Sequence, residues 1–170
     1  MILAKNKEMR VAFCTFDGPT AISGVNTWMV RFLPRLSATG VNVRVFVYVS
    51  GEPESWQTVA ALQDAGVECE CYAWEGDARD EVREVLRRTR AFRPDVFVPN
   101  CSGRAYFAVR WLRKAGIPTV GVIHADTPYY TAGVMDQFVT GPVDARLSAV
   151  VCVSEATQEL FCSRAQAGQG

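Results

Sequence analysis

Apolar and polar residues alternate along the chain in blocks that predict strands and helices in turn. Short runs rich in Val, Ile and aromatic residues are separated by longer segments in which apolar residues recur every three or four positions, the spacing of one helix face. The short runs predict strands at 11–14, 41–50, 67–74, 95–99, 119–123 and 149–153. The longer segments predict helices at 24–39, 54–65, 77–92, 104–115 and from Glu155 onward, whereas 125–145 is expected to be irregular or partly helical.

The order of these elements predicts the fold class. Strands that alternate with helices form an α/β domain with a mainly parallel sheet, and right-handed crossovers favour a doubly wound, Rossmann-like, three-layer α/β/α arrangement. The nearly unbroken apolar run from Val45 to Val49 fits a strand that is covered on both faces. Pro34 lies inside the first predicted helix and should kink it or end its regular part early. In this architecture, ligands bind at the carboxyl ends of the strands.

The length of 170 residues predicts one domain, which we place at residues 10–164. Because a second Met, Met9, directly precedes the first strand, residues 1–9 are expected to be an N-terminal extension, and the small and polar residues 165–170 a frayed tail. No apolar run approaches the roughly 20 residues of a membrane span, and no signal-peptide pattern begins the chain. We therefore expect a cytoplasmic protein.

Composition and charge argue against several classes of function. Lys plus Arg and Asp plus Glu number 18 each, so no overall field points to a nucleic-acid partner. The arginines between 83 and 93 could touch an anionic membrane surface, although the carboxylates among them favour a solvated helix face, so peripheral membrane contact stays an open alternative. The six cysteines form no CxxC pair, and one histidine cannot complete a zinc set, so we expect buried reduced thiols and no metal cofactor.

Residues 15–26 form the first candidate site. They link the first strand to the start of the first helix, where backbone N–H groups are unpaired and the helix dipole is positive, so the loop can seat a phosphate or another anion. Gly18 and Gly24 do not make the GxGxxG pattern of a dinucleotide site, and no Lys-Ser/Thr pair follows as in a Walker loop. No GxSxG elbow of a hydrolase occurs either. The sequence therefore gives no support to NAD, to Walker-type nucleotide hydrolysis or to a Ser-His-Asp triad.

Two further candidates follow the fourth and fifth predicted strands. His124, the only histidine, stands directly after the fifth strand, with Asp126 close behind it. A histidine with an ordinary pKa near 6.5 could act as an acid, a base or a hydrogen-bond donor. Asn100, Ser102 and Gly103 follow the fourth strand and could either contact a ligand or cap the next helix.

Four local patterns resemble those of GT-B glycosyltransferases of family GT4. Residues 23–28 (Ser-Gly-Val-Asn-Thr-Trp) resemble the Gly-Gly-x-x motif, and 93–96 (Arg-Pro-Asp-Val) the "RPDVVH" segment. Residues 121–126 are similar to the histidine-bearing strand of the family, and 151–156 to its "VSE" strand-to-helix turn. Their order along residues 10–160 makes the signal fairly specific. The resemblance implies the N-terminal, acceptor-side Rossmann domain of a retaining glycosyltransferase that uses a nucleotide-sugar donor.

The resemblance also implies roles for individual residues. His124 would be the catalytic residue, hydrogen-bonded to the transferred sugar. Gly24 would let the loop approach the donor diphosphate or the acceptor, and Asn26 would contact an acceptor hydroxyl or phosphate. Ser23 stands where the family has the first glycine, which narrows the backbone freedom of the loop. Motifs and strand ends together give the predicted substrate contacts as Ser23, Gly24, Val25, Asn26, Asn100, Asp126 and Ser154.

GT-B enzymes have a second Rossmann domain that binds the nucleotide diphosphate, and this chain ends after its sixth strand and the following helix. We therefore expect an excised N-terminal domain or a subunit that pairs with a separate donor-binding partner, inactive by itself. An apolar interface left uncovered would favour a dimer. The expected partners are the nucleotide-sugar donor, an acceptor and the missing domain. Two alternatives stay open: half of a nucleotide-sugar epimerase with the same two-domain architecture, and a non-catalytic α/β module that binds an anion or a sugar.

Overall fold

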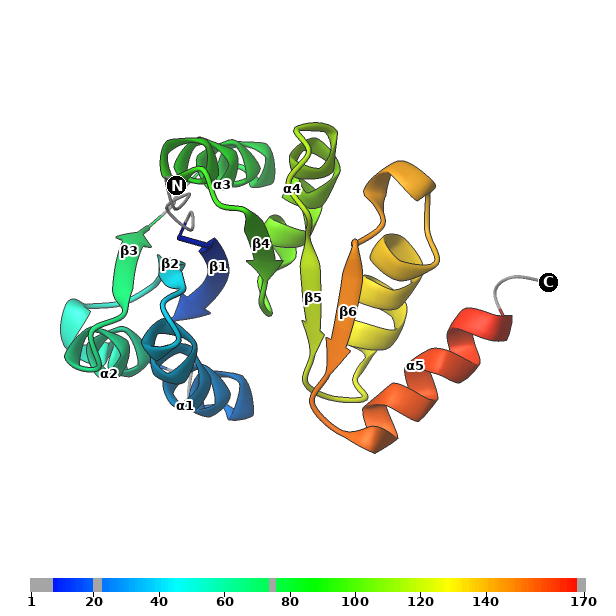
Figure 1. Cartoon of the computed structure of the whole chain (residues 1–170), viewed down its shortest axis with the longest axis horizontal. Coiled ribbons are helices and arrows are strands. Elements are labelled where there is room, and N and C mark those ends of the chain that lie inside the picture. The colour runs from blue at the N-terminus through cyan, green and yellow to red at the C-terminus, as the bar shows by residue number, and fades with distance from the viewer. Residues whose placement is uncertain (1–7, 20–22, 74–75, 168–170) are drawn as a thin grey trace, which may run out of the picture.

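A computed structural model describes residues 8–19, 23–73 and 76–167 of the chain (Figure 1). The strands of this part are β1 (Arg10–Asp17), β2 (Asn42–Val49), β3 (Glu68–Tyr72), β4 (Val96–Pro99), β5 (Val120–Ile123) and β6 (Ala149–Cys152). The α-helices are α1 (Gly24–Ala38), α2 (Gln57–Asp64), α3 (Ala78–Phe92), α4 (Gly103–Lys114) and α5 (Glu155–Ala167). A π-helix, η2 (Tyr129–Val139), and two short 3₁₀ turns at Pro53–Ser55 and Val143–Ala145 complete the order. The predicted alternation of strands and helices is confirmed.

The strands form a doubly wound parallel sheet. They pair in the order β3-β2-β1-β4 and, separately, β5-β6, and each of these pairings is parallel. A bridge between Phe97 and Thr119 joins β4 to β5, where the N–H of Phe97 donates to the carbonyl of Pro118 at 2.9 Å. The spatial order 3-2-1-4-5-6 is that of a Rossmann fold, and it reverses between β1 and β4. The carboxyl ends of these two strands therefore form the switch point at which such folds bind ligands.

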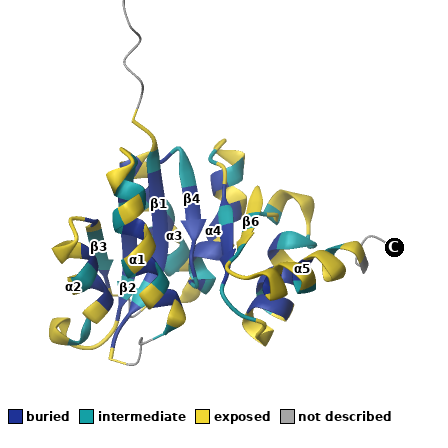
Figure 2. Ribbon diagram, turned by 60° about the horizontal axis from the view of Figure 1, so that its bottom comes forward, coloured by how far each residue is buried: buried dark blue, intermediate teal, exposed yellow. Residues whose placement is uncertain are grey.

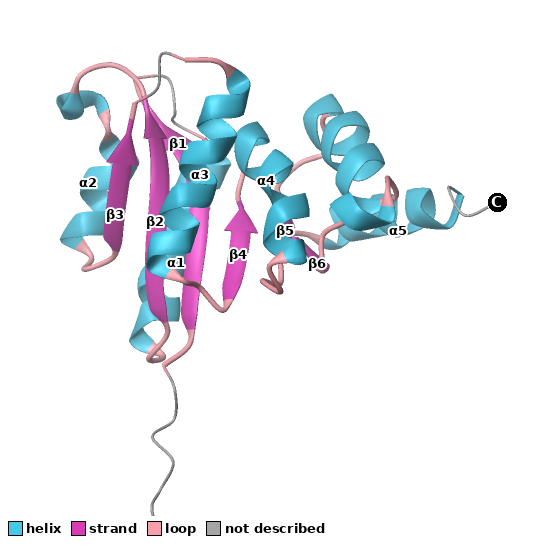
Figure 3. Cartoon of the chain, turned by 90° about the horizontal axis from the view of Figure 1, so that it is seen from above, coloured by secondary structure: helices cyan, strands magenta, loops and turns pink. Residues whose placement is uncertain are grey.

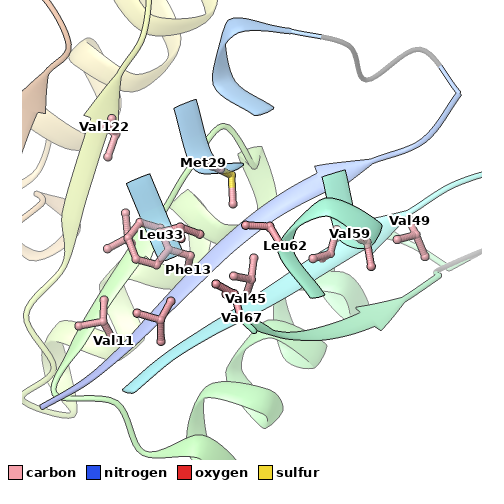
Figure 4. Packing of buried hydrophobic residues seen from close by; sticks show 13 residues of the cluster. Val11, Phe13, Met29, Leu33, Val45, Val49, Val59, Leu62, Val67 and Val122 are labelled. Atoms are coloured by element: carbon pink, nitrogen blue, oxygen red, sulfur yellow. The ribbon is translucent and has the colours of Figure 1, made fainter. Parts of the chain in front are cut away.

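Helices cover both faces of the sheet, as Figure 3 shows. Alternate residues of β1 face opposite helix layers: Val11 and Phe13 belong to the core cluster under α1 and α2, and Ala12 and Cys14 to the cluster under α3 and α4. Figure 4 shows the first cluster, in which Met29, Leu33, Val59 and Leu62 from α1 and α2 pack onto the valines of β2. A third cluster joins η2 and α5 to α4 and β5. The central strands β1, β2, β4 and β5 are mostly buried, which explains the continuous apolar runs of the sequence, whereas the edge strand β6 is partly exposed (Figure 2).

Several details differ from the expectations. α1 does not end at Pro34 but continues to Ala38, because the fully buried Leu33 and the partly buried Leu36 hold both sides of the proline against the core. α5 extends through Ala167 into the segment expected to fray, and residues 168–170 lie outside the described residues. The carbonyl of Met9 accepts the N–H of Asn42, so this residue already contributes to strand pairing, whereas 1–7 are not described.

The cysteines are free thiols with different environments. Cys14 is buried as expected, and burial raises its pKa to about 11, so its thiol stays protonated at neutral pH. Cys162 is exposed, contrary to the expectation of buried thiols, because it lies on the outer side of α5; the other four are half-buried. Within the described ranges, no helix combines the length and the apolar character needed to cross a bilayer.

Candidate functional site

The start of α1 is organised by a small hydrogen-bond network. Ser23 is the N-cap of α1: its Oγ accepts the N–H of Asn26 at 3.4 Å and donates to Asn26 Oδ1 at 3.0 Å. Nδ2 of Asn26 donates to Thr58 Oγ1 of α2 at 2.6 Å, and Asn26 is 6% exposed. Both polar ends of the Asn26 side chain are thus used inside the protein, and its contact with an acceptor stays a prediction.

Gly24 and Val25 present backbone rather than side chains to a ligand. A Cβ atom on Gly24 would meet nothing within 4 Å, so the packing of the protein does not require glycine at this position. Val25 is a residue of α1, and its side chain is buried. Because the first N–H groups of a helix have no partner within the helix, the open space beside Gly24 suits a close approach of an anionic group.

A cavity of about 230 Å³ lies between the end of β1, α1 and α2, and its lining includes Asp17, Ser23, Arg31 and Thr58. Asp17 is 2% exposed: its Oδ1 accepts the N–H of Gly18, and its Oδ2 accepts the N–H of Val59 in α2, both at 2.9 Å. Asp17 is not among the predicted site residues, although an acidic residue at a strand end inside the candidate loop is a usable signal. Its partner in α2 is 42 residues away, so no local pattern could predict that contact.

His124 lies directly after β5, half-buried, against three other elements. Its Nε2 is 2.7 Å from Oδ1 of Asn100, and its ring packs edge-on to Trp28 of α1, with centroids 5.2 Å apart. The ring of Tyr130 in η2 lies 6.3 Å away. Burial lowers the pKa of His124 from 6.5 to about 4, because the interior penalises the charged imidazolium. The histidine is therefore neutral at physiological pH and suited to hydrogen bonding rather than to proton donation.

The other predicted site residues are placed at neighbouring strand ends. Asn100 is 0% exposed at the end of β4, and Ser102 caps α4 by accepting the N–H of Ala105 at 3.4 Å. Ser154 is exposed and caps α5 by accepting the N–H of Thr157 at 3.3 Å. Asp126 is exposed after β5, and no hydrogen bond or ion pair of its carboxylate occurs among the residues that the structure covers. The structure thus brings His124 to Asn100 but does not bring Asp126 into contact with them.

Trp28 and Tyr130 were missed as neighbours of the site. Trp28 lies in the motif 23–28 and in the first predicted helix, and Tyr130 lies in the segment 125–145 that is expected to be irregular or partly helical. Their signal is aromatic character near a strand end, which in a single sequence does not differ from core packing.

The grouping of acidic and basic side chains bears on metal and membrane contacts. In the described portions of the chain, no three His, Cys, Asp or Glu side chains gather to hold a metal ion. In the basic segment, Arg83 pairs with Asp80 at 2.5 Å, and Arg87 with Glu84 at 2.7 Å. These pairs support the interpretation of a solvated helix face, and membrane contact stays a prediction.

Solved structures with similar folds include enzymes of two kinds. The Anabaena protein HepE, solved with UDP, has a TM-score of 0.62 at 16% identity over 93% of this chain and 41% of that chain. The lipopolysaccharide outer core galactosyltransferase WaaB has a TM-score of 0.50 at 13% identity, over 66% of this chain and 32% of that chain. A UDP-GlcNAc 2-epimerase from Neisseria meningitidis, bound to UDP-GlcNAc, has a TM-score of 0.58 at 11% identity, over 92% of this chain and 44% of that chain. The chain therefore has the fold of one Rossmann-like half of a GT-B architecture and spans about two fifths of the first of these structures.

The sequence itself gives the family. No curated protein sequence matches the chain. The model of Glycosyltransferase Family 4, however, matches residues 22–168, which contain α1, the residues from β2 to β6 and the site around His124. The chain therefore belongs to Glycosyltransferase Family 4.

Proposed function

We propose that the chain is the acceptor-side domain of a retaining glycosyltransferase, which moves a sugar from a nucleotide-sugar donor to an acceptor. The observation that carries the proposal is the position of His124 in a Family 4 chain: a neutral imidazole at the carboxyl end of β5, held beside the N-terminal part of α1. A neutral imidazole can hydrogen-bond a sugar hydroxyl without placing a charge near the reacting carbon.

The proposal gives each part of the site a task. His124 binds and orients the transferred sugar, and the open first turn of α1 offers backbone N–H groups to an anionic group of the donor or the acceptor. The cavity beside Asp17 and Thr58 receives the acceptor. Exposed Ser154 follows β6, which pairs with β5, so a contact of Ser154 with the acceptor fits the same edge of the sheet.

The donor is expected to be held mainly outside this chain. The similar folds of HepE and of the Neisseria epimerase were solved with UDP and UDP-GlcNAc, which supports a nucleoside-diphosphate sugar as the donor class. Because the chain spans about two fifths of HepE, the residues that bind the nucleotide are proposed to lie on a second domain or subunit. The isolated 170-residue chain should then bind an acceptor weakly and catalyse no transfer. The proposal uses no metal ion and includes a cytoplasmic location.

A nucleotide-sugar epimerase is the second candidate, because epimerases share the fold over 92% of this chain. Epimerisation requires acid and base groups that exchange protons with the sugar. Burial lowers the pKa of His124 to about 4, so at neutral pH this residue could supply the base of such an exchange but not the acid.

The full-length gene product tests the proposal. With a nucleotide-sugar donor and a panel of acceptors, wild-type protein should release nucleoside diphosphate only when an acceptor is present. His124→Ala should lower kcat by about 100-fold, the usual loss when one transition-state hydrogen bond is removed. Ser102→Ala, which removes a helix cap nearby, is the control and should keep most of the activity.

The assay also separates the alternatives. An unchanged kcat in His124→Ala would remove the catalytic role of this residue. Conversion of the donor to its epimer without any acceptor would replace the transferase by an epimerase. Saturable binding of a sugar phosphate with neither reaction would leave a binding module.

A further inference from the structure

The end of β4 places a buried amide directly against the ring of His124. Oδ1 of Asn100 is 2.7 Å from Nε2 of the histidine, and Asn100 is 0% exposed. The N–H of Asn100 donates to the carbonyl of Cys14 on β1 at 2.9 Å, which fixes the residue at the strand end. Because no surface of Asn100 is open, its side chain acts on the histidine ring rather than on a ligand.

The end of the amide that meets the ring decides the tautomer. Oδ1 of Asn100, rather than Nδ2, lies within hydrogen-bond distance of Nε2 of His124. An amide oxygen only accepts hydrogen bonds, so this contact requires the proton to be on Nε2. Within the described residues, Nδ2 of Asn100 is buried and has no hydrogen-bond partner.

The other ring nitrogen of His124 has a different environment. Nδ1 makes no hydrogen bond with the described residues. It is not buried, so it is open to solvent. Trp28 packs edge-on against the ring, at an angle of 77°, and restricts its rotation. If Nε2 carries the proton, Nδ1 carries a lone pair that can accept a hydrogen bond.

We propose that Asn100 is a positioning residue, whose carbonyl oxygen accepts the Nε2–H of His124, fixes this tautomer and leaves Nδ1 as an acceptor for a ligand hydroxyl. The class of ligand, a sugar whose hydroxyl donates to Nδ1, rests on the proposed function. The tautomer is a property of the chain itself, and it can be measured without substrate.

Nuclear magnetic resonance of the 170-residue chain provides the test, because His124 is the only histidine and its ring signals need no assignment. With isotope-labelled histidine at neutral pH, the nitrogen shifts should show a protonated Nε2 and an unprotonated Nδ1. A proton on Nδ1 would overturn the proposal, because Asn100 would then donate from Nδ2.

Two variants test the part played by Asn100. Asn100→Leu removes the acceptor and should convert the single tautomer to a mixture, whereas Asn100→Asp should keep Nε2–H and raise the pKa of His124 by about 1 to 3, because an adjacent carboxylate favours the imidazolium. Ser102→Ala alters the same turn and should leave the ring shifts unchanged. An unchanged tautomer in Asn100→Leu, or an unchanged pKa in Asn100→Asp, would overturn the proposal.

The measurements remain decisive if one variant is unstable. Should Asn100→Leu fail to fold, the wild-type tautomer and the titration of Asn100→Asp still decide the question. Absence of glycosyl transfer in the full-length protein would refute the proposed function and leave these ring shifts as they are. If both proposals hold, Asn100→Leu should lower kcat, and the double variant with His124→Ala should be no slower than His124→Ala alone, since both act through one ring.

Discussion

At the scale of the residue, Gly24 separates packing from ligand binding. A methyl group at this position meets nothing within 4 Å, so Gly24→Ala should leave the free energy of unfolding unchanged or raise it by about 0.5 kcal/mol, as for other glycines in compatible conformations. The same methyl group occupies the space proposed for the ligand, and it should lower kcat/KM of the full-length enzyme. Urea unfolding and steady-state kinetics measure the two effects.

The matched control for this glycine is Gly18, in the same loop. A Cβ atom there would overlap Ser50 Oγ, which can rotate away, and would lie 3.2 Å from the carbonyl oxygen of Ser50, which cannot, so Gly18→Ala should destabilise the fold by about 1 kcal/mol. Full activity in Gly24→Ala would show that no ligand approaches the first turn of α1.

At the scale of the element, α2 depends on a cap from another strand. α2 has no side-chain cap of its own, and Asp17 of β1 accepts the N–H of Val59 in its first turn. Asp17→Ala should lower the free energy of unfolding by about 2 kcal/mol, because it leaves two buried N–H groups without an acceptor. Asp77→Ala removes the exposed local cap of α3 and should cost less in the same urea titration. Equal losses would contradict the importance of burial for the Asp17 cap.

At the scale of the whole molecule, the apolar edge of the sheet predicts self-association of the isolated chain. Val151 in β6 is 48% exposed, and Val153, directly after the strand, is 42% exposed. In the described part of the sheet, β6 pairs only with β5. Val151→Glu should shift sedimentation of a concentrated sample toward the monomer, because it places a charge on the contact surface. Val143→Glu, on an exposed turn that is hydrogen-bonded to Arg113 of α4, is the control; an equal effect of both changes would exclude the β6 edge as the contact.

Much of the fold could be predicted from local signals. Asp77, Ser102 and Ser154 cap α3, α4 and α5, as their positions before helical segments indicate. The unbroken apolar run in β2 predicted burial on both faces, and the structure confirms it. The π-helical form of η2 and the passage of α1 through Pro34 were not predicted, because tertiary packing determines both.

The candidate site was predicted as a set of positions but not as an arrangement. His124 was selected because it ends a strand, and strand ends meet at one edge of a parallel sheet. Its partners Asn100 and Trp28 lie on other elements, 24 residues away in the case of Asn100, and single-sequence patterns extend over only a few turns or one strand.

The sequence by itself determined the order of the elements, the parallel sheet and the candidate residues, because hydrophobic periodicity and helix caps are local properties. Only the tertiary structure decided which of these residues touch. It places the amide of Asn100 on the ring of His124, Asp17 on the first turn of α2, and Asn26 on Thr58. Each contact joins elements that are distant along the chain. Asn100 meets His124 because β4 and β5 are neighbours in the sheet, and α2 meets Asp17 and Asn26 because it packs beside α1 and the end of β1.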